Sequence, residues 1–174
     1  MTTVLFPGTF DPIHYGHINI AKRAADLFDR VVVAVYARSQ KNILFPTEER
    51  LALVEESLKG IENISVTTYT GLTVKFAEQV GAQSIVRGLR VFSDFEYEFR
   101  MALANNRLAP GIDVIALITS EEHTFLSSTT VREIAALGGD VSSMVPKHVE
   151  KALKKRFNLL GDDQNIVPLT SLRD

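Results

Sequence analysis

The sequence predicts an α/β domain in which a parallel sheet carries helices on both faces. Short runs of β-branched residues alternate with longer segments whose apolar residues recur at helical spacing. Several of the short runs are apolar almost throughout, as in strands that are covered on both faces. A repeated strand–helix–strand order joins parallel strands through right-handed crossovers.

Five strands are predicted, over residues 2–6, 30–36, 64–68, 84–86 and 113–118. Six helices are predicted between and after them, over residues 17–28, 47–58, 73–80, 94–108, 129–137 and 147–157. This order gives a Rossmann-like, doubly wound sheet of five parallel strands. We expect residues 1–157 to form a single domain and residues 158–174 to form a C-terminal tail.

Local chemistry supports the helix assignments. The first helix places Ile18, Ala21 and Ala25 on one face. The second begins with acidic residues such as Glu48, which suit the positive end of the helix dipole, and Pro146 precedes the last helix as a usual first-turn residue. Ligands of open α/β sheets bind beyond the carboxyl ends of the strands, so functional residues are expected directly after strands.

The composition predicts a soluble protein and excludes several kinds of chemistry. Of 174 residues, 45% are hydrophobic, and 19 basic against 21 acidic residues leave a formal net charge of −2. We therefore expect no nucleic-acid partner. The absence of cysteine excludes disulfides, thiolate metal sites and cysteine nucleophiles. No signal peptide is recognised, and the apolar run 31–36 is too short for a membrane span, so a cytoplasmic protein without membrane contact is expected.

The segment 7–17, PGTFDPIHYGH, leads from the first strand into the first helix. Glycines at 8 and 16 allow the backbone to approach a ligand closely, and a helix start offers free N–H groups and a positive dipole end that suit phosphate. His14 and His17 are three residues apart, so both imidazoles can point towards one edge of the first turn. Taken alone, the pair also fits a loop with two solvent-facing histidines, or two metal ligands, although no third ligand lies nearby.

Two further motifs follow later strands. RGLR at 87–90 follows the fourth strand and offers two guanidinium forks to phosphate. Alone, it would sooner indicate surface arginines that bridge carboxylates such as Asp94 or Glu96. EEHTFLSSTTVRE at 121–133 follows the fifth strand, and its hydroxyl residues are good N-caps, so a second helix start is expected to face the same crevice. An ordinary capped helix would carry the same residues.

The three motifs in this order, with DFEYE at 94–98, resemble those of the nucleotidylyltransferase superfamily and, within it, the phosphopantetheine adenylyltransferases. H-x-G-H carries the resemblance to the superfamily, and RGLRVFSDFEYE narrows it; together they cover about residues 3–157. The resemblance implies transfer of the adenylyl group of ATP to 4′-phosphopantetheine, which gives dephospho-coenzyme A and pyrophosphate in the penultimate step of coenzyme A biosynthesis. It implies direct in-line attack on the α-phosphate without a covalent intermediate.

The resemblance also implies roles for single residues. His17 and Lys41 are expected to be catalytic, with His17 at the α-phosphate and Lys41 at the phosphate of phosphopantetheine. The residues expected to bind ATP are Thr9, Phe10, His17, Gly88, Leu89, Arg90, Glu98, His123, Thr124, Phe125, Leu126, Ser127, Ser128 and Thr129. Those expected to bind phosphopantetheine are Thr9, Lys41, Thr73 and Arg87. No residue is expected to hold a metal, since Mg²⁺ would arrive on the ATP phosphates.

A homohexamer built from two trimers and feedback inhibition by coenzyme A are further implications of the resemblance. Two alternatives stay open. One is a sister enzyme that adenylylates nicotinamide mononucleotide or transfers CMP to an alcohol phosphate, which RGLR and DFEYE disfavour. The other is a nucleotide-sensing module or flavodoxin-like carrier, which predicts a damaged H-x-G-H motif or a missing phosphate lysine.

Overall fold

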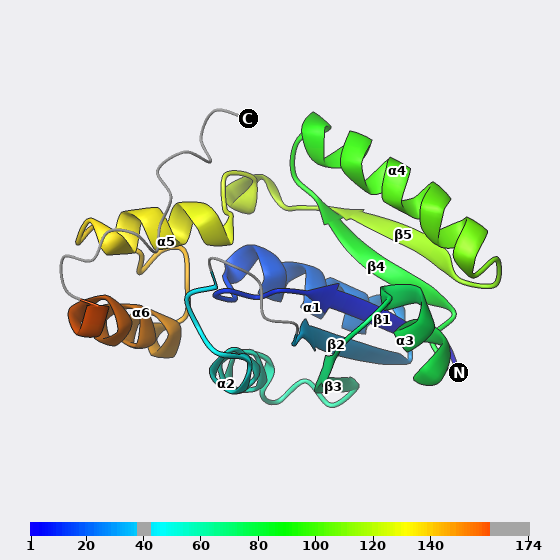
Figure 1. Ribbon diagram of the computed structural model, residues 1–174, viewed down its shortest axis with the longest axis horizontal. Coiled ribbons are helices and arrows are strands. Elements are labelled where there is room, and N and C mark those ends of the chain that lie inside the picture. Colours follow the sequence, from blue (N-terminus) through cyan, green and yellow to red (C-terminus); the bar gives the residue numbers. More distant parts are fainter. Residues whose placement is uncertain (38–42, 161–174) are drawn as a thin grey trace.

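The computed structural model describes residues 1–37 and 43–160 and is built around one parallel sheet (Figure 1). Its strands are β1 (Thr3–Gly8), β2 (Arg30–Tyr36), β3 (Ile64–Tyr69), β4 (Ser84–Leu89) and β5 (Asp113–Ile118). They lie in the order β3-β2-β1-β4-β5, and every pair of neighbours is parallel. The predicted fold class is confirmed.

Each predicted helix is present, and a short 3₁₀ helix adds to them. The helices are α1 (Tyr15–Leu27), α2 (Thr47–Leu58), α3 (Thr73–Gln79), α4 (Phe92–Leu108), η1 (Glu121–His123), α5 (Ser128–Ala136) and α6 (Lys147–Leu160). Helix α6 extends three residues past its predicted end and so includes the first residues of the predicted tail. The rest of that tail, residues 161–174, lies outside the described residues.

One boundary differs from the prediction in a way that matters for the site. The RGLR segment was expected to follow the fourth strand, but its first three residues belong to β4. They pair in register with the last residues of β5, with Arg87 opposite Ala116 and Leu89 opposite Ile118. Because successive side chains of a strand point to opposite faces of the sheet, membership in β4 decides to which face each of these side chains is directed.

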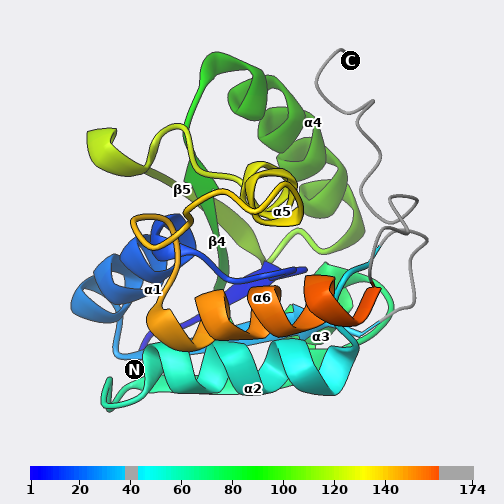
Figure 2. The same ribbon diagram turned by 90° about the vertical axis from the view of Figure 1, so that its left-hand side faces the viewer.

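Alternate residues of each strand supply two apolar layers. On one face, Val4 and Phe6 of β1 pack with residues of α1, α2, α5 and α6. On the other face, Leu5 packs with residues of α3 and with Ala109 and Ile112, which follow α4. Figure 2 shows α2 and α6 side by side, and the two helices are joined where Ser57 Oγ lies 3.0 Å from the Nε2 atom of a histidine in α6.

Within the described residues, no helix is long and apolar enough to cross a membrane.

Candidate active site

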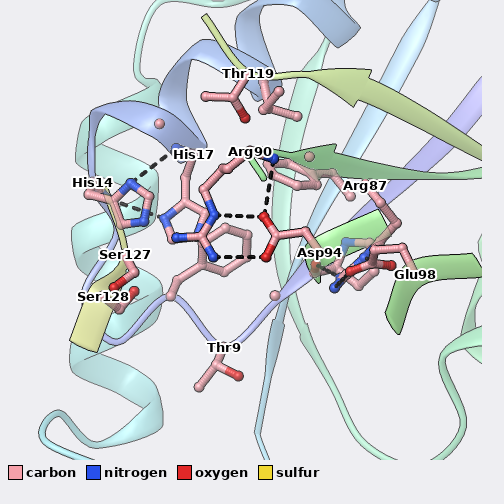
Figure 3. Close-up of a pocket in the computed structure, with 17 residues that line it drawn as sticks. Thr9, His14, His17, Arg87, Arg90, Asp94, Glu98, Thr119, Ser127 and Ser128 are labelled. Atoms are coloured by element: carbon pink, nitrogen blue, oxygen red, sulfur yellow. Dashed lines mark hydrogen bonds and ion pairs between the residues drawn. The ribbon is translucent and has the colours of Figure 1, made fainter. Parts of the chain in front are cut away.

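A cavity of about 300 Å³ opens at the carboxyl ends of β1 and β4 (Figure 3). These strands are neighbours in the sheet, but β2 and β3 separate them in the sequence. The chain passes from β1 to β2 on one side and from β4 to β5 on the other, so the two connections leave in opposite directions. Open α/β sheets bind ligands at such a point. The start of α1, the start of α5 and the first half of α4 complete the wall.

The turn after β1 is shaped by Phe10. A Cβ atom at Gly8 would lie 2.8 Å from the Phe10 ring, so only glycine fits there. Phe10 has φ 49°, a left-handed conformation that costs a residue with a side chain about 1–2 kcal/mol. Its buried ring packs edge-on against Phe6 and His17, with centroid distances of 5.6 and 5.0 Å. This packing leaves Thr9 exposed at the mouth of the cavity.

The two histidines of the H-x-G-H motif form a reciprocal helix cap. His14 is the N-cap of α1, and its Nδ1 accepts from the backbone N–H of His17 at 3.4 Å. The Nδ1 of His17 accepts from the backbone N–H of His14 at 3.3 Å, and the rings stack with centroids 3.7 Å apart. Because Nδ1 of neutral His17 is an acceptor, its proton is on Nε2. His14 is buried, so the loop with two solvent-facing histidines is excluded.

Both imidazoles are held neutral. The pKa of His17 is lowered from 6.5 to about 3, chiefly by burial and then by the positive charges of Arg90 and Arg87. The pKa of His14 is also lowered well below 6.5, chiefly by burial and then by the neighbouring His17 ring and the Arg90 guanidinium. His17 is therefore a neutral hydrogen-bond donor at physiological pH.

Arg87 is paired with the carboxylate of Glu98 on α4. Its Nε and Nη2 atoms donate to the two Glu98 oxygens at 2.8 and 2.6 Å, and Nη1 donates to the carbonyl of Pro7 at 3.1 Å. Burial lowers the pKa of Arg87, but the hydrogen bonds and charge of Glu98 outweigh burial and raise it above the ordinary value. The pair joins the end of β4 to both β1 and α4.

Arg90 is paired in the same way with Asp94. Its Nε donates to Asp94 at 3.0 Å, and Nη1 donates to the carbonyl of Leu126 at 2.6 Å. Burial raises the pKa of Asp94, but the hydrogen bond and charge of Arg90 outweigh burial and hold it below its usual range. Of the two carboxylates considered as arginine partners, Glu96 instead pairs with Arg100 on the exposed side of α4.

The start of α5 reaches the cavity through two serines. Ser127 is the N-cap, and its Oγ accepts from the backbone N–H of Thr130 at 3.0 Å. Ser128 Oγ donates to the carbonyl of Pro12 at 2.9 Å, which fixes α5 against the turn after β1. Both serines line the cavity.

Two smaller cavities adjoin the main one and share residues with it. One, of about 120 Å³, is lined by Thr73, Glu98, Met101 and Asn105 among others. The other, of about 190 Å³, lies between Thr9 and a pair of tyrosines from β2 and β3. Arg87 lines all three cavities.

The structure brings together most of the residues that the sequence singled out. Those that line the main cavity are Thr9, Phe10, His17, Arg87, Gly88, Arg90, Glu98, Ser127 and Ser128. Thr73 lines the smaller cavity beside Glu98. Those that line none of these cavities are Leu89, His123, Thr124, Phe125, Leu126 and Thr129. Lys41 lies outside the described residues, and all of the binding roles stay predictions.

Several residues that line the cavity were not among the predicted site residues, although Asp94 had been considered as an arginine partner. Asp94 lines the cavity as the partner of Arg90. Ile20 lines it one helical turn beyond His17. A Cβ atom added at Gly88 would lie only 3.2 Å from the Ile20 side chain. Thr119 directly follows the last residue of β5. Its position beyond the carboxyl end of a strand is a signal that could have identified it.

The cavity is suited to a polyphosphate. It offers a neutral imidazole donor, two guanidinium groups and a helix start, all of which bind phosphate oxygens. Among residues 1–37 and 43–160, no group of three or more His, Cys, Asp or Glu side chains is arranged to hold a metal ion. The metal-ligand alternative for the two histidines therefore has no support in this part of the chain.

Comparisons with known proteins agree with this geometry. Residues 5–134 match the family model described as cytidylyltransferase-like. The phosphopantetheine adenylyltransferase of Roseiflexus sp. (strain RS-1) is 50% identical over 157 residues, which are 90% of this chain and 98% of the relative. That of Desulfitobacterium hafniense (strain Y51) is 45% identical over 94% of this chain and 100% of the relative. That of Gloeobacter violaceus is 51% identical over 88% and 95%.

A solved structure shares the fold. The lipopolysaccharide core biosynthesis protein from Thermoplasma volcanium GSS1 matches with a TM-score of 0.50 and 27% sequence identity, over 69% of this chain and 97% of that one. The parallel sheet and the named relatives together define the protein as an α/β nucleotidyltransferase. The chain belongs to the cytidylyltransferase-like family and, within it, to the phosphopantetheine adenylyltransferases.

Proposed function

We propose that this protein transfers the adenylyl group of ATP to 4′-phosphopantetheine, which yields dephospho-coenzyme A and pyrophosphate. The observation that carries the proposal is the neutral His17 ring, held with its proton on Nε2 beside Arg87 and Arg90 in a cavity at the switch point of the sheet. The names of relatives that are about half identical over nearly their whole length support the choice of substrates.

The reaction needs no base and no covalent intermediate. An oxygen of the phosphopantetheine phosphate attacks the α-phosphorus of ATP in line, and the bond to the oxygen that bridges to the β-phosphorus breaks. The attacking phosphate is already ionised near neutral pH, so no proton has to be removed from it. The protein contributes by positioning two polyanions and by hydrogen bonds to the charge that develops at phosphorus.

Individual residues take distinct parts in this proposal. His17 donates from Nε2 to an oxygen of the α-phosphate, and Arg90 and the start of α5 hold the pyrophosphate that leaves. Thr9 and Arg87 orient phosphopantetheine from the side of the smaller cavities. Lys41, which lies outside the described residues, is proposed to contact the phosphate of phosphopantetheine.

Mg²⁺ is proposed to enter with ATP. The two carboxylates in the wall, Asp94 and Glu98, are each bonded to an arginine, which leaves them less free to coordinate a cation. A magnesium ion held by phosphate oxygens and water suits such a site, because Mg²⁺ keeps several of its waters. When bound, it would neutralise phosphate charge.

The direct test is incubation of the protein with ATP, Mg²⁺ and phosphopantetheine, followed by mass spectrometry. Formation of dephospho-coenzyme A with release of pyrophosphate is expected. A parallel panel replaces the acceptor with nicotinamide mononucleotide, and replaces ATP and acceptor with CTP and glycerol phosphate. Turnover of nicotinamide mononucleotide with ATP, or of glycerol phosphate with CTP, without turnover of phosphopantetheine would overturn the proposed substrate.

We propose further that the chain assembles into a hexamer of two trimers and acts in the cytoplasm, where ATP is available. Helix α4 supports self-association, because it has no buried residue and carries a row of exposed aromatic side chains. Phe92, Phe95 and Phe99 are 85%, 49% and 53% exposed and pack against one another along the helix. Apolar surface of this extent marks an interaction site.

Coenzyme A is proposed as a feedback inhibitor of the same site. It carries the pantetheine arm, so the cavities beside Arg87 would accept it in place of phosphopantetheine. Added coenzyme A is then expected to raise the KM for phosphopantetheine and to leave kcat unchanged.

A further inference from the structure

Arg50 of α2 is an arginine buried beneath the site. It is 1% exposed, although arginine is almost never fully buried without a charged partner. Among the described residues it forms no ion pair with a carboxylate, and its guanidinium donates to oxygen atoms of the backbone and of Thr47. The nearby carboxylates that act on its charge belong to Asp11 and Glu48.

Two of the backbone partners of Arg50 lie at the carboxyl ends of β1 and β2, and the third lies just before α2. Its Nη1 atom donates to the carbonyl of Thr9 at 2.7 Å and to that of Tyr36 at 2.9 Å. Its Nε atom donates to the carbonyl of Phe45 at 3.0 Å. Thr9 and Tyr36 both line the cavity of about 190 Å³, so Arg50 lies behind this wall and touches it through two carbonyl groups.

The hydrogen bond from Arg50 to the Thr9 carbonyl affects Phe10, the strained residue of the turn. The Thr9 carbonyl belongs to the peptide plane that joins Thr9 to Phe10, and the orientation of this plane is coupled to φ of Phe10. That φ is 49°, which persists only where the surroundings fix it. Arg50 thus holds the plane that keeps Phe10 turned inwards and Thr9 at the mouth of the cavity.

A second buried group holds the other end of the same turn. The Asp11 carboxylate, 3% exposed, accepts from the backbone N–H groups of Leu44 and Phe45 at 2.8 and 2.9 Å. Arg132 of α5 donates to the same carboxylate at 3.3 Å. Phe45 therefore connects Asp11 and Arg50, because its N–H donates to the Asp11 carboxylate and its carbonyl accepts from Arg50.

We propose that Arg50 is a positioning residue for the reaction: it fixes the turn at residues 9 and 10 so that Thr9 and His17 meet both substrates in the reactive geometry. Arg50 touches neither substrate and acts through the Thr9 carbonyl and the Phe10 ring. Nε and Nη1 donate to carbonyls and Nη2 donates to the Thr47 hydroxyl, in directions that a lysine ammonium cannot reproduce. The kinetic part of this inference rests on the proposed function.

The test compares Arg50→Met and Arg50→Lys with Leu153→Ala, a control that opens the core at a fully buried residue of α6. For Arg50→Met we expect kcat to fall about 100-fold with the Kd for ATP, measured by calorimetry without the second substrate, within about threefold of wild type. Arg50→Lys, which keeps the charge and part of the bonding, is expected to recover kcat to about tenfold below wild type. Leu153→Ala should leave kcat within about twofold.

Three results would overturn the proposal: a folded Arg50→Met protein with kcat within about threefold of wild type, an equal loss of kcat in Leu153→Ala, or an ATP affinity that falls as far as kcat. If Arg50→Met does not fold, Arg50→Lys decides, since an unchanged kcat in that variant contradicts the proposal.

Hydrogen–deuterium exchange gives a readout that needs no turnover. In Arg50→Lys we expect faster exchange in the peptide that spans residues 6–13 and unchanged exchange in α6, and the reverse in Leu153→Ala. Unchanged exchange at 6–13 would refute the anchoring role. If wild type makes no dephospho-coenzyme A, the proposed function fails, while the exchange experiment still tests whether Arg50 holds the turn.

Discussion

His17 illustrates how a backbone contact defines the chemistry of a side chain. Its Nδ1 accepts from the N–H of the helix cap, so its proton is on Nε2, and burial with nearby arginines keeps the ring uncharged. A neutral donor loses less solvation energy in a buried site than a cation would. The residue can thus hydrogen-bond to a phosphate that gains charge without itself gaining or losing a proton.

Replacement of His17 tests this role. His17→Ala is expected to lower kcat by about 10²–10³-fold, because one donor to the developing charge is lost, while the Kd for ATP stays within about threefold. Stopped-flow or coupled pyrophosphate assays give kcat, and calorimetry gives Kd. His148→Ala is the matched control, since His148 belongs to α6, contacts α2 through its ring and lies outside the cavity. Near-normal turnover of His17→Ala would contradict the role.

The lowered pKa of His17 also predicts how stability depends on pH. The folded-state pKa of about 3 lies below the ordinary value of 6.5, so between these values the unfolded chain binds the extra proton. The contribution of His17 to the free energy of unfolding is therefore complete above about pH 7 and is lost as the pH falls below about 6.5. Urea unfolding of wild type and His17→Gln checks this. Their difference in unfolding free energy should shrink towards about pH 4, and a pH-independent difference would refute it.

At the scale of elements, α4 is attached to the sheet by charge rather than by a core. None of its residues is buried, while Glu98 and Asp94 bond to Arg87 and Arg90 at the end of β4. The Glu98 side chain is only 14% exposed, so loss of its partner leaves a poorly solvated carboxylate. These ion pairs both position α4 and set the charge of the cavity.

A double-mutant cycle measures this attachment. Arg87→Ala is expected to lower the free energy of unfolding by about 2 kcal/mol, because Glu98 loses a bidentate partner. The double variant Arg87→Ala/Glu98→Ala should lose less than the sum of the single variants, with a coupling energy of about 1–2 kcal/mol. The exposed pair of Arg100 and Glu96 on the same helix is the control and should couple by less than about 0.5 kcal/mol. Equal coupling in both pairs would show that burial is unimportant here.

The sequence predicted the strands and helices well, because their apolar patterns are strong and local. It did not predict that Arg87 belongs to β4, since Arg and Gly are poor strand signals and pairing with β5 decides the matter. Nor did it indicate that Arg50 and Asp11 are buried, because both look like ordinary surface charges until the turn after β1 and the start of α2 are brought together. Contacts between segments far apart in the chain account for most of what was missed in the site.

At the scale of the whole molecule, the exposed aromatic row on α4 predicts which face mediates the proposed assembly. Phe95→Glu/Phe99→Glu is expected to shift the protein from the proposed hexamer to smaller species in sedimentation velocity, because charges at an apolar interface are costly to bury. Leu27→Glu is the matched control, since Leu27 is 63% exposed at the far end of α1. A wild type that sediments as a monomer at micromolar concentration would refute the hexamer, and an unchanged double variant would exclude this face as the interface.

The arginine–carboxylate pairs have a consequence for selectivity among the anions of a cell. Among the described residues that line the cavity, the Arg87 and Arg90 guanidinium groups each already have a carboxylate partner, so a phosphate group that binds there exchanges one partner for another. A small anion such as sulfate gains little from this exchange, whereas ATP, which is proposed to contact the imidazole, Arg90 and the start of α5 at once, gains from all of them. Paired charges are thus expected to make the site favour a polyphosphate that spans it over simple anions.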